Sequence, residues 1–157
     1  MAEAPVMVRV AAEADGPAIV ALIRSAPRMN PTGLRWPNFV VAERGGRPVG
    51  AAQLRPSGAG VAELGSLVVE PAERGRGLAG RLIAAALARA DGRVLVVTAA
   101  GNARHYEPWA FRPVAPWRAP APVALNWGIG QAATVLRMAQ GGRPRRMLVL
   151  EARGPFG

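Results

Sequence analysis

Residues 61–90 read VAELGSLVVEPAERGRGLAGRLIAAALARA, and this stretch decides the fold of the chain. It begins with a short apolar run, 64–69, that Pro71 closes, which is typical of a largely buried strand. Apolar residues then recur at steps of three and four and predict an amphipathic helix over 78–90. These residues are Leu78, Leu82, Ile83, Ala86 and Leu87. The sequence therefore predicts a strand, a loop and a helix in succession.

A basic, glycine-rich loop joins this strand to this helix. Its residues are Arg74, Gly75, Arg76, Gly77, Leu78, Ala79 and Gly80. Glycine lets the backbone approach a ligand closely, and the N-terminus of a helix presents amide groups that have no intrahelical acceptor. Such a loop binds anions, most often phosphate groups.

The segment 75–80 also matches the G-x-G-x-x-G fingerprint of dinucleotide-binding proteins. In that fold the first glycine follows the strand almost directly, whereas residues 70–74 intervene here. The fold also needs an acidic residue at the end of the next strand, but the apolar run 94–98 is followed by Ala-Ala-Gly. The sequence has no G-K-[ST] either, which excludes a P-loop. The phosphate ligand is therefore expected to be of another kind.

The spacing Arg-x-x-Gly-x-Ala at Arg74, Gly77 and Ala79 follows V-V-E-P and precedes the amphipathic helix. In this respect the chain resembles the GCN5-related N-acetyltransferase (GNAT) superfamily. The resemblance implies that the loop wraps the pyrophosphate of acetyl-CoA. It also implies that the backbone at the end of the preceding strand hydrogen-bonds the pantetheine arm of the co-substrate. The strand residues concerned are Leu67, Val68 and Val69.

A second stretch, GNARHYEPWAF over 101–111, is similar to the segment in which family members have Asn, a short helix and F-Y-E-x-x-G-F. Tyr106, the only tyrosine, matches the residue that gives a proton to the departing CoA thiolate. A phenol suits this task because its pKa of about 10 is near the value of about 8.5 for a thiol. The resemblance further implies that Asn102 contacts the coenzyme, whereas packing or local hydrogen bonding is the favoured role of the neighbouring His105.

For the general base, the resemblance points to Glu63, which stands before Leu64 at the start of the strand, as in the histone acetyltransferase branch. A partly buried carboxylate takes up a proton from an amine directly or through water. The other hypothesis is that Glu63 is a solvated charge at the strand edge. Backbone amides at 67–69 would polarise the thioester carbonyl if this strand splays from its neighbour, as it does in the family.

The N-terminal third of the sequence predicts a strand and a helix. Alternating residues in Val6–Val10 indicate the strand, and Asp15 is expected to cap the helix with Pro17 in its first turn. Three residues of this helix are expected to face the core. They are Ile19, Leu22 and Ile23.

Further strands are predicted at 39–43 and 48–54, joined by a turn at Gly45-Gly46, and these form an antiparallel meander with the strand at 64–69. The chain then crosses over through the 78–90 helix to a parallel strand at 93–98. The prediction is a mixed α/β fold with a mostly antiparallel sheet flanked by helices. A single GNAT domain is expected over residues 1–157.

Near the C-terminus the sequence predicts one more helix, over 127–139, followed by a last strand at 146–151. Asn126 is a candidate cap for this helix. Four apolar residues would form one stripe along it, namely Ile129, Ala132, Ala133 and Leu136. Such a helix is an addition to the minimal family fold, and covering the acceptor site and forming a homodimer contact are its two candidate roles.

The formal net charge is +10, and all 20 basic residues are arginine. Arginines are scattered through every segment and aromatic residues make up only 5% of the chain, which disfavours a nucleic-acid-binding surface. Because the chain has one histidine and no cysteine, no metal site is predicted. The longest apolar region, 123–139, is too short and too polar to span a bilayer. We therefore expect a cytoplasmic protein with no membrane partner.

Together these features predict an N-acetyltransferase that moves an acetyl group from acetyl-CoA to a primary amine of a small molecule by direct attack. Two other hypotheses stay open. One is an acyl-CoA-binding or regulatory module that keeps the fold without the reaction. The other, which rests on the charge alone, is a basic nucleic-acid-binding domain.

Overall fold

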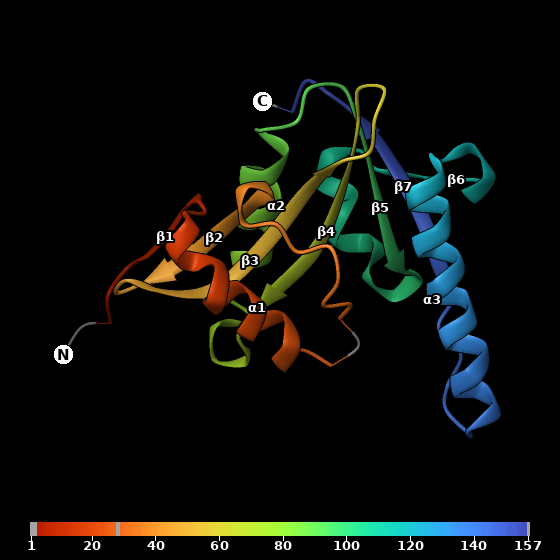
Figure 1. The fold of residues 1–157 in the computed structure, drawn as a ribbon, viewed down its shortest axis with the longest axis horizontal. Helices are drawn as coiled ribbons and strands as arrows, with labels where there is room; N and C mark the ends of the chain where they lie inside the picture. The colour runs from red at the N-terminus through yellow and green to blue at the C-terminus, as the bar shows by residue number, and fades with distance from the viewer. Residues whose placement is uncertain (1–2, 28, 157) are drawn as a thin grey trace. The chain divides into compact units, whose positions relative to one another are not determined.

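The computed structural model describes residues 3–27 and 29–156. Their contacts divide them into two compact units (Figure 1). The first unit comprises the described residues up to Arg55 together with Leu64–Arg89, and the second comprises Pro56–Glu63 together with the described residues from Ala90 onward. That all 157 residues form a single domain stays a prediction.

The strands of the first unit follow the order β1-β2-β3-β4. β1 (Val6–Val10) pairs antiparallel with β2 (Phe39–Arg44), and β2 pairs antiparallel with β3 (Arg47–Pro56). β4 (Val61–Val69) begins in the second unit and continues into the first. Between β2 and β3 the chain turns at two glycines with positive φ, Gly45 and Gly46, as the sequence predicts.

Two α-helices belong to the first unit, α1 (Gly16–Ser25) and α2 (Leu78–Leu87), and α2 packs on β1 and β2. α2 ends three residues before the predicted boundary of 90, and its five apolar stripe residues are buried as predicted. α1 begins after Asp15, but that side chain does not cap the helix. The carboxylate instead accepts hydrogen bonds from Arg9 and from the backbone amide of Ala12.

The core of the first unit lies between α1 and the strands. It contains the three predicted core residues of α1, Phe39 and Val41 of β2, and Val68 of β4. Short 3-10 turns connect the larger elements of this unit. They are η1 (Glu13–Asp15), η2 (Trp36–Asn38) and η3 (Pro71–Glu73).

In the second unit the first residues of β4 are followed in the strand order by β5 (Arg93–Ala99), β7 (Met147–Arg153) and β6 (Arg112–Val114). β7 pairs antiparallel with β5 on one side and with β6 on the other. The 3-10 segments η4 (Ala100–Trp109) and η5 (Pro116–Arg118) connect these strands. The fold class is thus the predicted mixed α/β one, with mostly antiparallel strands flanked by helices.

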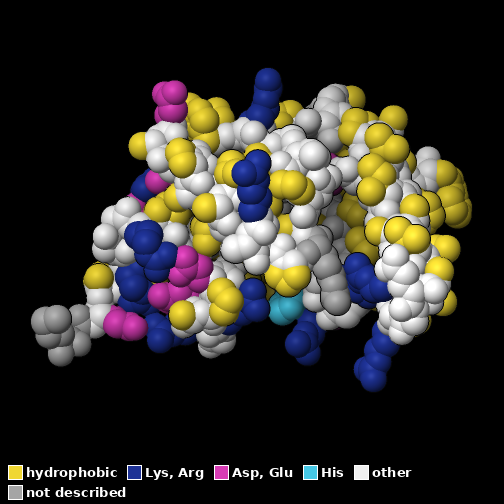
Figure 2. All heavy atoms as spheres, turned by 60° about the horizontal axis from the view of Figure 1, so that its bottom comes forward, with side chains coloured by type: hydrophobic (Ala, Val, Ile, Leu, Met, Phe, Trp, Pro, Cys, Tyr) yellow, Lys and Arg dark blue, Asp and Glu magenta, His cyan; other side chains and the backbone are white. Residues whose placement is uncertain are grey.

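The last helix, α3 (Ala121–Ala139), corrects two predictions. It begins six residues before the predicted start, because Pro120 and Pro122 fit the start of a helix, where an amide N–H is not needed. Asn126 therefore lies inside the helix and is not its cap. The predicted apolar stripe lies at the surface, where Ile129 and Leu136 are 53% and 62% exposed. Hydrophobic side chains gather at the surface on the right of Figure 2, the side on which Figure 1 draws α3. A homodimer through this helix stays a prediction.

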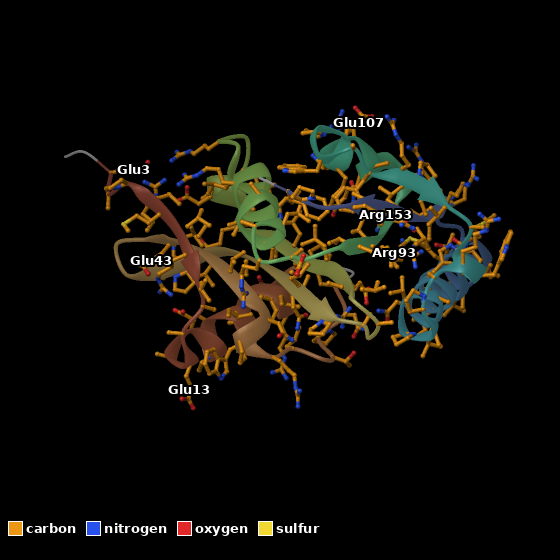
Figure 3. All side chains as sticks on the ribbon, turned by 90° about the horizontal axis from the view of Figure 1, so that it is seen from above. Glu3, Glu13, Glu43, Arg93, Glu107 and Arg153 are labelled. Atoms are coloured by element: carbon orange, nitrogen blue, oxygen red, sulfur yellow. The ribbon has the colours of Figure 1, made fainter. Side chains whose placement is uncertain are left out.

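A carboxylate paired with two arginines in the second unit makes stability sensitive to acid. Glu151 of β7 accepts hydrogen bonds from Arg93 at 2.6 Å and from Arg153 at 3.1 Å, and Figure 3 labels both arginines on their neighbouring strands. The Arg93 hydrogen bond in particular holds the pKa of Glu151 below its ordinary value. Since the folded-state pKa is the lower one, the stabilisation is present above the unfolded-state value of about 4 and is lost as the pH falls below it.

We expect the free energy of unfolding to fall between pH 7 and pH 3, and to fall less in Glu151→Gln, because this variant lacks the titrating carboxylate. Urea unfolding followed by circular dichroism at several pH values measures both changes. An equal fall in the variant and the wild type would contradict the assignment.

Candidate active site

Two glycines of the loop in the first unit adopt a backbone conformation that favours glycine. Gly75 and Gly77 have φ values of +75° and +74°, in the left-handed region, and a Cβ added at either position would meet no atom within 4 Å. Gly77 is the N-cap of α2, and no side chain caps the helix there. The amide of Arg81 donates to the carbonyl of Gly77. The amides before Arg81 in the first turn therefore have no acceptor within the helix. A helix N-terminus that follows two such glycines, each with open space where a side chain would lie, is the geometry of an anion site.

The two arginines of the loop differ in their contacts. Arg74 Nε donates to the carbonyl of Val69 at 3.1 Å, which ties the loop to the end of β4. Arg76 forms ion pairs with Glu3 at 2.8 Å and with Glu73 at 3.6 Å. Glu73 also accepts two hydrogen bonds from Arg44, which lower the pKa of this carboxylate. Figure 2 shows dark blue arginine and magenta carboxylate side chains gathered at its lower left. Of the two loop arginines, Arg76 is thus the one already engaged by carboxylates.

An irregularity interrupts β4 just before the predicted pantetheine-binding residues. Ser66 has a φ of +50°, which is uncommon for a residue with a side chain and clusters at functional sites. Its hydroxyl donates to Gln53 Oε1 at 3.2 Å, and Gln53 Nε2 donates to the carbonyl of Gly33 at 3.0 Å. Leu67 and Val69 are half-buried after this point, whereas Val68 is buried. The backbone of β4 is thus irregular at this point, and the splaying of the strand from its neighbour stays a prediction.

Sequence reasoning missed both Ser66 and Gln53. The available signal was Gln53 itself, a polar residue at the end of the apolar run 49–54. Gln53 has no exposed surface, and a buried amide requires hydrogen-bond partners, which the turn at Gly33 and the hydroxyl of Ser66 supply.

Glu63 lies in β4, within the second unit, and only 4% of its surface is exposed. Asn126 of α3 donates from Nδ2 to both carboxylate oxygens, at 2.9 Å to Oε1 and 3.1 Å to Oε2. The hypothesis of a solvated charge at the strand edge is therefore wrong. A buried carboxylate must be hydrogen-bonded, and the donor here comes from α3. Nothing in the sequence connects this helix with Glu63.

Tyr106 lies in η4 and is 6% exposed. Its ring packs edge to face against Phe111, with 5.7 Å between ring centroids. Burial raises the pKa of Tyr106, and a side-chain hydrogen bond with Thr98 of β5 offsets part of this rise. The phenol is therefore protonated at neutral pH. Thr98 was not predicted, since nothing in the sequence links it with residue 106.

The other candidates differ in exposure. Asn102 and His105 are exposed on η4, so the packing predicted for His105 is not seen. Trp36 and Trp117 are exposed, whereas Trp109 and Trp127 are half-buried. Within 3–27 and 29–156 there is no cluster of three His, Cys, Asp or Glu residues that could hold a metal ion. None of the helices in these ranges is long and apolar enough to cross a membrane.

The structure thus places the candidates in two sets. In the first unit, the loop 74–80 adjoins the end of β4, which carries Leu67, Val68 and Val69. In the second unit, Glu63 is joined to Asn126, and Tyr106 is joined to Thr98.

The sequence profile of the acetyltransferase (GNAT) family matches residues 14–107, which is more than half of the chain. The chain belongs to the GNAT family. The matched segment contains the glycine loop, Glu63 and Tyr106, and it ends before α3. No curated protein matches the chain.

Several solved structures share the fold of this GNAT chain. N-acetylglutamate synthase from Neisseria gonorrhoeae, complexed with coenzyme A and N-acetyl-glutamate, superposes with a TM-score of 0.71 at 21% identity over 97% of the chain. The chain spans only 36% of that synthase. Rv2747 from Mycobacterium tuberculosis, in complex with CoA and NLQ, superposes with a TM-score of 0.70 at 22% identity. The match covers 95% of this chain and 99% of Rv2747.

A third similar structure is the diaminobutyrate acetyltransferase EctA from Paenibacillus lautus, in complex with L-2,4-diaminobutyric acid and coenzyme A. Its TM-score is 0.61 at 16% identity, over 98% of this chain and 97% of EctA. At such identities the likeness establishes the fold alone.

Proposed function

We propose that the chain is an N-acetyltransferase that moves an acetyl group from acetyl-CoA to a primary amine of a small molecule. The observation that carries this proposal is the glycine loop at the start of α2, whose left-handed Gly75 and Gly77 leave the first-turn amides open, in a chain of the GNAT family. The fold shared with CoA-complexed acetyltransferases supports it.

Acetyl-CoA fits the residues that the loop offers. Its pyrophosphate would meet the amides at the start of α2 and the guanidinium of Arg74, which is exposed and anchored at one nitrogen by Val69. The half-buried backbone at Leu67 and Val69 would hydrogen-bond the pantetheine arm. A role for Asn102 in coenzyme binding remains part of the proposal, and its exposure on η4 leaves the side chain accessible.

The reaction needs three groups. The lone pair of the neutral amine attacks the thioester carbonyl carbon, and backbone amides at 67–69 stabilise the oxyanion that forms. Glu63 accepts the proton that the attacking nitrogen loses. The carbon–sulfur bond then breaks, and Tyr106 gives its proton to the departing thiolate. The products are the N-acetylated acceptor and CoA, and solvent returns the two side chains to their starting protonation states.

Two of the comparisons and the charge of the chain support a choice of acceptor class. Two of the similar structures, a synthase and an acetyltransferase, contain N-acetyl-glutamate and L-2,4-diaminobutyric acid respectively. A chain with a formal net charge of +10 also favours anionic small molecules over polycations. We therefore place small amines that carry a carboxylate first in the acceptor screen.

The experiment that tests this function is a screen of amino acids, diamino acids and simple amines with acetyl-CoA, followed through the release of the CoA thiol. Turnover of at least one amine, with a matching acetylated product in the mass spectrum, is the expected result. Binding of acetyl-CoA without turnover of any amine would instead favour the acyl-CoA-binding module.

Tyr106→Phe is expected to lower kcat roughly tenfold, because the variant keeps the buried ring but lacks the proton donor. The effect is modest since a thiolate, with a thiol pKa of about 8.5, leaves without full protonation. Steady-state kinetics on the best amine measures the change. Phe111→Leu serves as the control for the ring contact. Unchanged turnover in Tyr106→Phe would remove the acid assignment and leave the rest of the proposal in place.

A further inference from the structure

Asn126 occupies a position that helix propensity does not favour. It lies in the interior of α3, where asparagine is a poor residue because its side chain competes for backbone hydrogen bonds. Its Nδ2 instead reaches across to β4 and donates to both oxygens of Glu63, at 2.9 and 3.1 Å. The presence of asparagine at this position is therefore explained by its hydrogen bonds to Glu63 and not by helix propensity.

α3 is fixed against the start of β7 by a row of side-chain hydrogen bonds. Trp127 Nε1 donates to the carbonyl of Met147 at 3.1 Å, and the amide of Met147 donates to Gln131 Oε1 at 2.9 Å. One turn later, Thr134 Oγ1 donates to the carbonyl of Arg145 at 2.9 Å. Val123, with no exposed surface, packs in the core cluster at the N-terminal end of the helix. These contacts set the rotation of α3 and hence the direction in which Asn126 points.

A general base must stay within hydrogen-bond reach of the proton that it takes up, and its supporting groups decide whether it does. A glutamate side chain has several rotatable bonds, so a carboxylate without directional partners would sample several orientations. The paired donation from Asn126 restricts Glu63 because both oxygens are engaged by one rigid amide group.

The geometry points to Asn126 as a positioning residue, which holds the carboxylate of Glu63 in the orientation that accepts the proton of the acceptor amine. This inference rests on the proposed function. Asn126 acts through Glu63 and itself contacts neither the amine nor acetyl-CoA. It lies outside the segment 14–107 that matches the family, so the inference assigns α3 a part in the reaction.

The test is a double-mutant cycle on kcat, measured with acetyl-CoA and the best amine of the screen. Asn126→Ala is expected to lower kcat five- to tenfold and to leave KM for acetyl-CoA unchanged. In the Glu63→Gln background the same substitution is expected to cause no further loss, since the group through which it acts is already absent. Leu125→Ala, which removes the exposed neighbour on the same helix, is the matched control and should keep full turnover.

Alanine is a better helix former than asparagine, so Asn126→Ala does not weaken α3 itself. Circular dichroism and thermal unfolding check this point. If the variant still fails to fold, Asn126→Gln, which keeps the amide group and moves it by one methylene, replaces it in the same cycle with the same expected loss.

Three outcomes would overturn the inference. Full turnover in the Asn126 variant contradicts a positioning role, and an equal fractional loss in both backgrounds indicates a purely structural one. Full turnover in Glu63→Gln removes the base and the inference with it. By contrast, a wild-type protein that binds acetyl-CoA but acetylates no amine contradicts the proposed function itself, so the two failures are distinguishable.

Discussion

Glu63→Gln is expected to lower kcat by about 10²- to 10⁴-fold, the usual contribution of a general base. Glutamine keeps the size of the side chain, and its carbonyl oxygen can still accept from Asn126, so the variant removes the proton acceptor while it retains the local packing. KM for acetyl-CoA is expected to stay unchanged, since the proposed coenzyme contacts lie in the loop 74–80, at the end of β4 and at Asn102, and do not include Glu63. Steady-state rates of thiol release measure both constants.

The control for this prediction is Glu13→Gln, which removes an exposed carboxylate in η1 and should leave the rate unchanged. Measurement over a range of pH separates loss of the base from a change in the rate-limiting step. A Glu63→Gln protein with wild-type kcat would show that proton removal occurs elsewhere, and the assignment of the base would fail.

Gly77→Val is expected to raise the Kd for acetyl-CoA about 100-fold. The φ of +74° is unfavourable for any residue with a Cβ, by roughly 1–2 kcal/mol, so the loop would change its conformation. The changed loop and the added branched side chain would both stand at the N-terminus of α2, where the pyrophosphate is proposed to bind. Calorimetric titration with acetyl-CoA measures the change in Kd.

Gly46→Val is a matched control for the strain in Gly77→Val. Gly46 lies in the β2–β3 turn of the same unit, has a φ of +81°, and would likewise meet no atom within 4 Å of an added Cβ. This substitution therefore carries a similar backbone cost without entering the proposed site. Thermal unfolding should show comparable destabilisation in the two variants, whereas only Gly77→Val should bind acetyl-CoA weakly. Equal Kd values in both variants would contradict the location of the coenzyme.

Much of the fold could be predicted because its elements have local signals. Alternation in β1, the paired glycines before β3 and the apolar stripe of α2 are each set by neighbouring residues, and the structure confirms them. The loop before α2 was predictable for the same reason, since its glycines and arginines are neighbours in the sequence. Strand and helix ends were less certain, as the early end of α2 shows.

The contacts of the candidate base could not be predicted, because residues far apart in the sequence make them. Asn126 is a good N-cap by composition, and only the two prolines at the start of α3 show that the helix begins earlier. Once Asn126 lies inside the helix, its distance to Glu63 depends on how α3 packs against β5 and β7. Periodicity likewise predicts the apolar stripe of α3 but not what covers it, so the two candidate roles of this helix stay predictions.

The most direct test of the central claim is calorimetric titration of the wild-type protein with acetyl-CoA at low and moderate salt. We expect one site per chain with micromolar affinity, and weaker binding in Arg74→Ala, since the exposed side chain of Arg74 is tied to the carbonyl of Val69 beside the proposed pyrophosphate site. Absence of binding at low salt in a folded protein would contradict acyl-CoA recognition, and with it the proposed acetyltransferase activity.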